Sequence, residues 1–409
     1  MPAFARRTQS PYRAALSTPG ALAFYVTAVP GRLGIAMTGL GLIWLVHRGS
    51  GSFAAAGVVG GAFAVAEAVA GPQVARVIDR FGQTRVLPAC VAIHAAAIAA
   101  LILAVLHGVP TPAEAAIAMI AGAALPEIGA LSAARWSWLL EADDVLPSAF
   151  ALEALSNEIA FLIGPVLVSG ISTLVDPIVG SALAAGLIVL GGAGLALQPG
   201  TAPPAGPAAA ISGSRQGLLV DPAFAVLIAV NLLLGILFGA FTVSTTAFAV
   251  VRGRAGLAGP LNGLMSATGI AGGWLYGRRR WRSHPWRQLG LALAMLAVCC
   301  LPVLVLGSLP GLGLTLLAGG LFLAPAMVQS SVLTRSVVER SRLTQAFTWL
   351  SSASAAGSGL GTAIAARTAE SLGGRGGFAL AAAAIALAAI STGVAGRAGW
   401  WPRRLDAPR

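Results

Sequence analysis

The sequence contains no lysine and little charge of either sign. All 26 basic residues are arginine, against 14 Asp and Glu, and charged residues make up 10% of the 409 residues. A soluble domain carries about 25% charged residues. This shortage argues against a water-exposed fold. The absence of lysine also excludes the Walker A loop G-x-x-x-x-G-K-[ST], and with it an ATP-driven pump that uses this loop.

Cysteine and histidine are scarce as well. The three cysteines (Cys90, Cys299 and Cys300) lie inside apolar runs without the spacing of metal ligands, and the four histidines are scattered over separate segments. No H-E-x-x-H motif occurs. We therefore expect no metal, no other cofactor and no enzymatic activity. The net charge of +12 is spread along the chain, so we expect no nucleic-acid partner.

Long apolar runs are what the sequence has in abundance. Hydrophobic residues make up 57% of the chain, and a helix needs about 20 apolar residues to cross the hydrocarbon of a bilayer. The sequence predicts an all-α integral membrane protein with twelve transmembrane helices. The expected spans are 21–46, 52–75, 86–107, 112–134, 148–172, 177–198, 219–250, 256–277, 288–309, 311–333, 344–367 and 376–397. The fourth span is the least regular, because Pro126 and Glu127 interrupt it.

A segment rich in Pro, Gly, Ala and Ser separates the sixth and seventh spans. Such a composition is typical of a flexible linker. We predict an N-terminal six-helix bundle (1–197), a cytoplasmic linker (198–217) and a C-terminal six-helix bundle (218–409).

The two halves show a faint internal repeat. At an offset of 197 residues, Ala149-Phe150 aligns with Ala346-Phe347, and Gly164 aligns with Gly361. Few identities match, so chance similarity remains an alternative. Two related halves would describe a transporter that rocks about a site near the middle of the membrane.

The arginines are distributed unevenly over the connecting segments. Twenty lie in segments on the side of the N-terminus, five lie on the opposite side, and Arg32 lies inside a span. Because cytoplasmic loops carry the excess of positive charge, we expect both termini in the cytoplasm of a protein that crosses the cell membrane many times.

Three of the glycine pairs with G-x-x-x-G spacing are expected to allow close helix packing. They are Gly57 with Gly61, Gly235 with Gly239, and Gly357 with Gly361.

The stretch GPQVARVIDRFG (71–82) stands between the second and third spans. We expect it to form a short charged loop in which Gly82 makes the turn, since glycine adopts positive φ freely. It resembles the motif G-x-x-x-D-R-x-G-R-K-x-x-L of the major facilitator superfamily. The matching residues are Asp79, Arg80, Gly82 and Leu87, whereas Ala75, Gln83 and Thr84 depart from the motif.

This resemblance covers nearly the whole chain and implies the fold of that family. It also implies that Asp79 pairs with Arg135 at the end of the fourth span and faces the N-terminus of the eleventh helix, at Ser341, Thr344 or Gln345. The expected gating group is therefore Asp79, Arg80, Gly82 and Arg135. A solvated turn that only follows the charge rule for cytoplasmic loops is the alternative.

The fifth span contains Gly164-Pro165. The proton-driven antiporters of the same family carry a longer glycine-rich motif around such a pair, and the other glycines are replaced here. The resemblance favours export, without assigning a drug-exporter subfamily.

Five ionisable residues lie inside the expected spans: Arg32, Glu67, Glu127, Glu153 and Glu158. A charge inside a bilayer costs at least about 2.5–3.5 kcal/mol, so each should face protein or water and find a partner. We expect Arg32 to pair with Glu127 or Glu158, and Glu153 to reach the membrane surface. The residues expected to couple substrate and protons are Arg32, Glu127, Glu158 and Glu67. A static pair that only stabilises the bundle is the alternative.

These patterns predict a secondary transporter, working as a monomer in the lipid bilayer, that exports a drug or metabolite against protons. An uptake carrier for a sugar or an amino acid is the second interpretation. A sensor with the same fold and no transport activity is the third, and the buried charges argue against it.

Overall fold

The computed structural model describes residues 10–140, 145–205, 218–254, 257–279, 281, 283–372 and 375–401, and none of these residues lies in a β-strand. The expected linker therefore lies partly outside the described residues, which omit 206–217. The α-helices are α2 (Pro11–Leu16), α3 (Ala21–Ser50), α4 (Phe53–Phe81), α5 (Gln83–Leu106), α6 (Thr111–Ala123), α7 (Ile128–Leu139), α8 (Leu146–Leu174), α9 (Pro177–Ala196), α10 (Pro222–Val251), α11 (Ala258–Arg278), α12 (Pro285–Cys299), α13 (Leu301–Leu306), α14 (Leu309–Val337), α15 (Leu343–Leu372) and α16 (Arg375–Arg397). Three short 3₁₀ turns are η1 (Pro199–Thr201), η2 (Leu218–Val220) and η4 (Arg340–Arg342).

Local sequence explains several helix starts. The side chains of Ser52, Asp176 and Ser308 accept hydrogen bonds from backbone N–H groups in the first turns of α4, α9 and α14. Such caps satisfy N–H groups that have no partner within the helix. Proline in the first turn of α9 and α14 adds to this signal, because the missing N–H is not needed there.

Ten helical segments of the described residues are long and apolar enough to cross a membrane. One of them contains both α6 and α7, and another contains both α12 and most of α13. The long helices α11 and α15 are not among the ten, because they carry many Gly, Ser and Thr residues in place of bulky apolar ones. Both lie against helices of the N-terminal half, where a strongly apolar surface toward lipid is not required.

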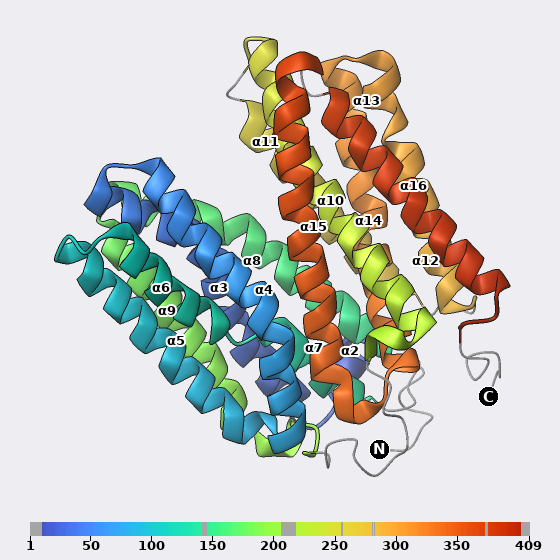
Figure 1. Cartoon of the computed structure of the whole chain (residues 1–409). Helices are drawn as coiled ribbons and strands as arrows, with labels where there is room; N and C mark the ends of the chain where they lie inside the picture. Colours follow the sequence, from blue (N-terminus) through green and yellow to red (C-terminus); the bar gives the residue numbers. More distant parts are fainter. Residues whose placement is uncertain are drawn as a thin grey trace.

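The helices form two groups that are in contact at one end of the molecule and apart at the other (Figure 1). Helices α3 to α9 pack on one another, and so do α10 to α16. Contacts between the groups join α4 to α15, α8 to α11 and α14, and α7 to α15. The short helix α2 and the last turns of α16 lie at the end of the molecule where the groups meet, and the groups diverge toward the opposite end.

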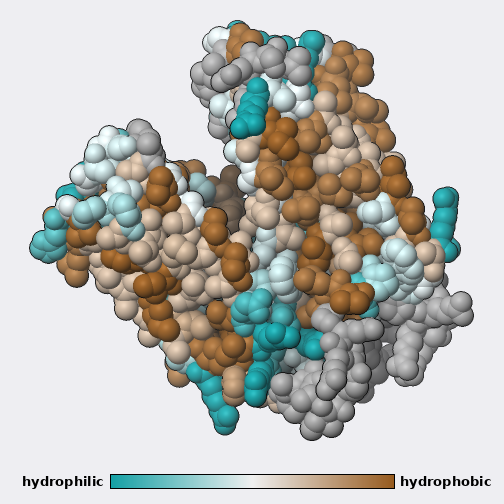
Figure 2. Space-filling model, in the orientation of Figure 1, coloured by the Kyte–Doolittle hydropathy of each residue, from teal (hydrophilic) through white to brown (hydrophobic). Residues whose placement is uncertain are grey.

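One buried apolar cluster extends through both groups. It joins residues such as Trp136 and Phe150 of the N-terminal half to Phe347 of the C-terminal half. The Phe150 and Phe347 rings lie 5.8 Å apart. Figure 2 shows that the surface is hollowed between the two groups at the end of the molecule away from α2. The molecule is thus closed at one end and open at the other.

The motif segment 71–82 is not the loop that the sequence suggested. Helix α4 continues to Phe81, so Asp79 and Arg80 lie in its last turn, and Pro72 is accommodated inside the helix. Only Gly82 separates α4 from α5, with φ of 94°. The prediction of a glycine turn is confirmed, but the charges are presented by a rigid helix end. Charged residues can continue a helix beyond the apolar core, because their side chains reach water or protein.

The glycine pairs of α10 and α15 face each other. A Cβ at Gly235 would overlap the backbone of Ser354, and a Cβ at Gly357 or Gly361 would overlap the backbone of Leu232 or Ile236. These glycines therefore allow the two helix backbones to touch, as the spacing predicts. The same prediction is wrong for Gly57 and Gly61, where a Cβ would meet open space.

Helix boundaries repeat at the offset of 197 residues seen in the sequence. Shifted by 197, the first residue of α8 (Leu146) falls on the first residue of α15 (Leu343). The last residue of α4 (Phe81) falls on the last residue of α11 (Arg278). These helices also contribute contacts between the halves, since α4 packs on α15 and α8 packs on α11.

Candidate functional site

A break divides the fourth apolar segment into two helices. Helix α6 ends at Ala123 and α7 begins at Ile128, although 111–139 forms a single stretch of membrane-crossing length. Pro126 has no N–H to continue a helix, and the N–H of Ile128 donates to the Pro126 carbonyl over 2.8 Å. Discontinuous membrane helices are a recurring feature of substrate sites in transporters.

A buried ion pair lies next to this break. The guanidinium of Arg32 on α3 donates through Nη2 to Glu153 on α8. Both residues are buried, with exposed fractions of 4% and 8%. The other carboxylate oxygen of Glu153 accepts hydrogen bonds from Ser132 Oγ and Trp136 Nε1, each over 2.7 Å. These hydrogen bonds help to stabilise the desolvated carboxylate of Glu153.

This pairing differs from the one expected from depth along the chain. Arg32 pairs with Glu153 rather than with Glu127 or Glu158, and Glu153 does not reach the surface. The physical reason lies on α7. Ser132 and Trp136 are four residues apart and therefore on one face of that helix, and both donate to Glu153. Sequence reasoning missed these two donors, although their spacing was visible.

Glu67 and Glu127 form a second polar group at the break. Glu67 lies on α4, which packs against α6, and the carboxylates of Glu67 and Glu127 are near enough to interact electrostatically. Glu127 precedes the first residue of α7, but its side chain makes no capping hydrogen bond. Both side chains are only partly buried. Within the described residues, neither has an ion-pair partner.

Glu158 lies apart from these groups and faces the other half. It is twelve residues from the start of α8, which corresponds to about 18 Å along the helix axis. Its carboxylate interacts with the Ser266 hydroxyl of α11 and lies beside Gly269 of the same helix. Glu158 is thus the acidic residue of this set that is positioned between the two halves.

The buried polar residues of α10 to α16 within the described part of the chain are uncharged. Asn231 Nδ2 donates to Ser330 Oγ over 2.8 Å and joins α10 to α14. Tyr276, Gln288 and Gln329 form a hydrogen-bonded group of their own. Among the described residues, the buried charged side chains therefore belong to the N-terminal half, and the buried polar side chains of the C-terminal half are neutral.

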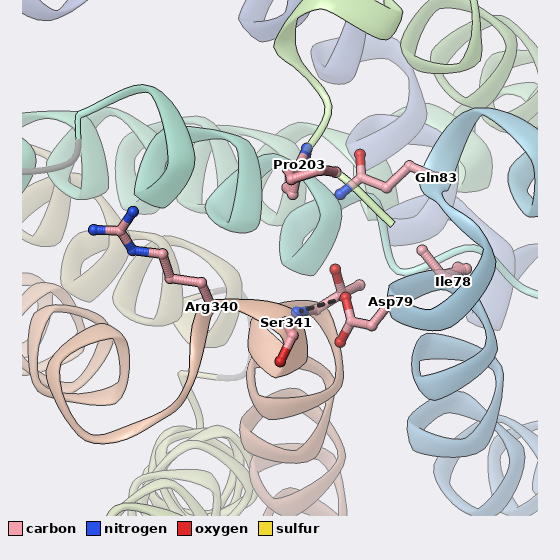
Figure 3. A pocket seen from close by; sticks show the side chains of 8 residues that line it. Ile78, Asp79, Gln83, Pro203, Arg340 and Ser341 are labelled. Carbon is pink, nitrogen blue, oxygen red and sulfur yellow. Dashed lines mark hydrogen bonds between the residues drawn. The ribbon is translucent and has the colours of Figure 1, made fainter. Parts of the chain in front are cut away.

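Asp79 connects the halves at the closed end. Its carboxylate accepts hydrogen bonds from the backbone N–H groups of Thr344 and Gln345, over 3.3 and 2.9 Å, in the first turn of α15. The contact to the helix N-terminus that the resemblance implied is therefore present. A carboxylate gains about 0.3–1 kcal/mol near such a terminus, and more when partly buried. Figure 3 shows Asp79 pointing toward Ser341 in a small pocket that is also lined by Gln83 and Pro203.

Arg135 does not pair with Asp79. Its guanidinium donates to Gln83 Oε1 over 2.9 Å and to the Leu195 carbonyl over 2.6 Å. It also donates to the Gln198 carbonyl and to the Thr201 hydroxyl. Gln83 occupies a motif position where the family pattern has a basic residue, so an amide is available there to accept from Arg135. The arginine consequently holds the start of the interdomain segment, while Arg80 is exposed.

Two further contacts at the closed end were not found from the sequence. Ser148 Oγ on α8 donates to the Gly277 carbonyl of α11 over 2.6 Å. The hydroxyl of Tyr12, on the short helix α2, donates to the carbonyls of Gly273 and Trp274 over 3.0 Å each. Both use backbone acceptors near the end of α11, which leave no side-chain signal in the sequence.

Several known structures are similar to this chain. The human organic anion transporter MFSD10 (TETRAN) aligns with a TM-score of 0.72 and 17% identity, covering 94% of this chain and 100% of that one. A bacterial homologue of the iron transporter ferroportin in an outward-facing state aligns with a TM-score of 0.73 and 14% identity, over 93% and 98%. The E. coli fucose:proton symporter FucP aligns with a TM-score of 0.69 and 14% identity, over 93% and 99%.

At these identities the structural matches show a shared fold. A comparison with curated protein sequences finds no match. A sequence model of the Major Facilitator Superfamily matches residues 24–318, which is more than half of the chain. The chain is a multi-pass membrane protein and a member of the Major Facilitator Superfamily of transporters.

Proposed function

We propose that this protein is a proton-coupled secondary transporter that exports a small organic molecule across the cell membrane. In this proposal the chain crosses the bilayer twelve times, with α11 and α15 completing the ten apolar segments. Residues 1–197 and 218–409 form two six-helix bundles, 198–217 connects them, and both termini lie in the cytoplasm. The repeat of helix boundaries at 197 residues and the bias of arginines support this arrangement.

The hollow between the halves is the proposed substrate path. With the termini in the cytoplasm, the closed end faces the cytoplasm and the open end faces outward (Figure 2). Opening toward the cytoplasm requires separating α4 from α15 and α8 from α11. Asp79, Gly82, Arg80 and Arg135 would then act in gating. Asp79 would do so through Thr344 and Gln345, and Arg135 through the segment after α9.

The observation that carries proton coupling is the position of Glu158. This carboxylate lies in the middle of α8 and faces Ser266 across the boundary between the halves, so rocking must change its surroundings. A carboxylate that alternates between a drier and a wetter environment binds and releases a proton in each cycle. Glu127 and Glu67, which have no ion-pair partner among the described residues, are the other proposed proton carriers. Arg32, fixed by Glu153, is the proposed substrate contact.

Reconstituted vesicles test this proposal. Purified protein in proteoliposomes with an imposed pH gradient should accumulate a substrate from a panel of hydrophobic cations, amino acids and sugars. Collapse of the gradient with a protonophore should abolish the accumulation. Accumulation that is unchanged by the protonophore would contradict proton coupling. Equal levels with empty liposomes would contradict transport itself.

A second candidate function is uptake of an amino acid by the same fold. The break between α6 and α7 beside Arg32 favours it, because broken helices in transporters present backbone groups to charged substrates. The direction in which a proton gradient drives accumulation in oriented vesicles separates export from uptake.

A further inference from the structure

Two of the three guanidinium nitrogens of Arg32 have no hydrogen-bond partner among the described residues. Nη2 is held by Glu153. Nε is buried and makes no hydrogen bond, and no hydrogen bond of Nη1 is found within the same part of the chain. Nη1 lies beside Gly129 on α7, 3.7 Å from the position that a Cβ at Gly129 would occupy. Because Nε–H points to the Nη2 side of the planar guanidinium, Nη1 is the donor that faces α7 and is available to an oxygen acceptor there.

The first turn of α7 presents more donors at the same place. Within the described residues, the backbone N–H groups of Gly129 and Ala130 have no hydrogen-bond partner, and Glu127 does not cap them. Helix α7 is 12 residues long, and a helix N-terminus carries a partial positive charge that favours anions. Gly129 itself is partly exposed. A carboxylate could therefore contact both Arg32 Nη1 and the first turn of α7.

Two acidic side chains lie next to these donors. Glu127 is two residues before Gly129, and Glu67 on α4 interacts with Glu127 electrostatically. The break therefore brings hydrogen-bond donors and acidic side chains together at one short segment of the chain. A simple anion would leave the two carboxyl groups without a partner, and a simple cation would leave Arg32 Nη1 without one.

We infer that the substrate of this transporter is a small zwitterion of the amino-acid type. Its carboxylate binds between Arg32 Nη1 and the first turn of α7, and its ammonium group binds Glu127 and Glu67. The inference rests on the proposed transport function and adds the class of substrate. Glu153, Ser132 and Trp136 act as positioning residues, because they hold Arg32 in place by hydrogen bonds.

Equilibrium binding of the twenty standard amino acids, radiolabelled, to the purified full-length protein tests the inference. At least one should bind. Its amide or methyl ester, which lacks the carboxylate, should bind roughly 10- to 100-fold more weakly, and so should its N-acetyl form, which lacks the ammonium group. Absence of binding by all twenty would overturn the inference. Equally tight binding of the ester or of the N-acetyl form would also overturn it.

A glycine variant provides a structural control. Gly129→Ala places a methyl group in ordinary contact with Arg32 Nη1 and in no other contact within 4 Å, so the fold should persist while the carboxylate is displaced. Binding should weaken about tenfold or more. Gly39→Ala, where a Cβ meets nothing within 4 Å, should bind like the wild type. Unchanged binding by Gly129→Ala, with a normal unfolding temperature, would overturn the inference.

Failure of the inference can be distinguished from failure of the proposed function. If an amino acid binds as described but causes no proton movement in vesicles, proton coupling is wrong and the inferred substrate class stands. If a sugar or a simple hydrophobic cation is accumulated by a proton gradient and no amino acid binds, the transport proposal stands and the inferred substrate class is wrong.

Discussion

Arg135 Nη1 donates a hydrogen bond to the hydroxyl of Thr201 over 2.5 Å, which ties the last turns of α7 to the segment that leaves α9. The same guanidinium satisfies the carbonyls of Leu195 and Gln198. Arg135 is fully buried. It therefore fastens the beginning of the connection between the halves to the N-terminal half.

We predict that Arg135→Ala destabilises the protein. Each buried acceptor that loses its donor costs about 1–3 kcal/mol, and Arg135→Lys should recover only part, because an ammonium cannot reproduce the planar set of donors. Thermal unfolding in detergent measures the effect. Arg48→Ala is the matched control, because Arg48 is exposed and its pair with Asp176 lies at the surface. Equal unfolding temperatures for Arg135→Ala and Arg48→Ala would contradict the prediction.

We predict that Asp79→Asn loosens the closed end without unfolding the protein. The amide oxygen can still accept from the N–H of Gln345, but the charge that the N-terminus of α15 favours is lost. Transport should slow, and a cysteine introduced at Ala151, which is buried near Gly277, should react faster with a maleimide. Asp221→Asn keeps its cap at the start of α10 and should change neither rate. Wild-type labelling and transport in Asp79→Asn would show that the contact has no role in gating.

We predict that Glu153→Leu is among the most damaging single changes in the N-terminal half. It leaves Arg32 buried without a counter-charge, which costs about 3–5 kcal/mol. Arg32→Leu combined with Glu153→Leu should regain most of the stability, because an apolar pair avoids the desolvation of two charges. A double-mutant cycle of unfolding free energies measures the coupling. Additive losses would indicate that the two residues do not depend on each other.

We predict that Gly357→Ala weakens the packing of α10 on α15. The added methyl group would overlap the carbonyl group of Leu232, and overpacking of this kind costs about 1–3 kcal/mol. Gly359→Ala, two residues away, meets nothing within 4 Å and should change stability by less than about 0.5 kcal/mol. Comparable unfolding temperatures for the two variants would rule out close backbone packing at Gly357.

The sequence predicted the features of the fold that depend on composition along one helix. Apolar length defined the membrane segments, Pro126 and Glu127 indicated the break between α6 and α7, and Gly82 indicated the turn after α4. The sequence did not predict that α4 continues through Asp79. Hydropathy stops at the first charges, whereas a helix continues as long as its backbone bonds are satisfied.

Partners across helices were harder to predict. The depth of a residue along its helix can be counted from the sequence, but the direction of its side chain around the axis depends on packing. Arg32 and Glu158 were therefore matched by depth, although Glu158 faces α11 and Arg32 faces Glu153. Contacts to backbone carbonyls, such as that of Tyr12 at Gly273, depend on tertiary structure alone.

Proton movement in vesicles tests the central claim most directly. Proteoliposomes loaded with a pH-sensitive dye should report a substrate-dependent proton flux with the wild type and with Asp176→Asn, which changes a carboxylate at the surface and keeps the cap of α9. Glu158→Gln should abolish this flux and uphill accumulation, while exchange of labelled for unlabelled substrate continues, because exchange needs no net proton step. Glu127→Gln serves as the second carboxylate variant. A normal proton flux in both glutamine variants would contradict the account and favour a facilitator whose buried charges are only structural.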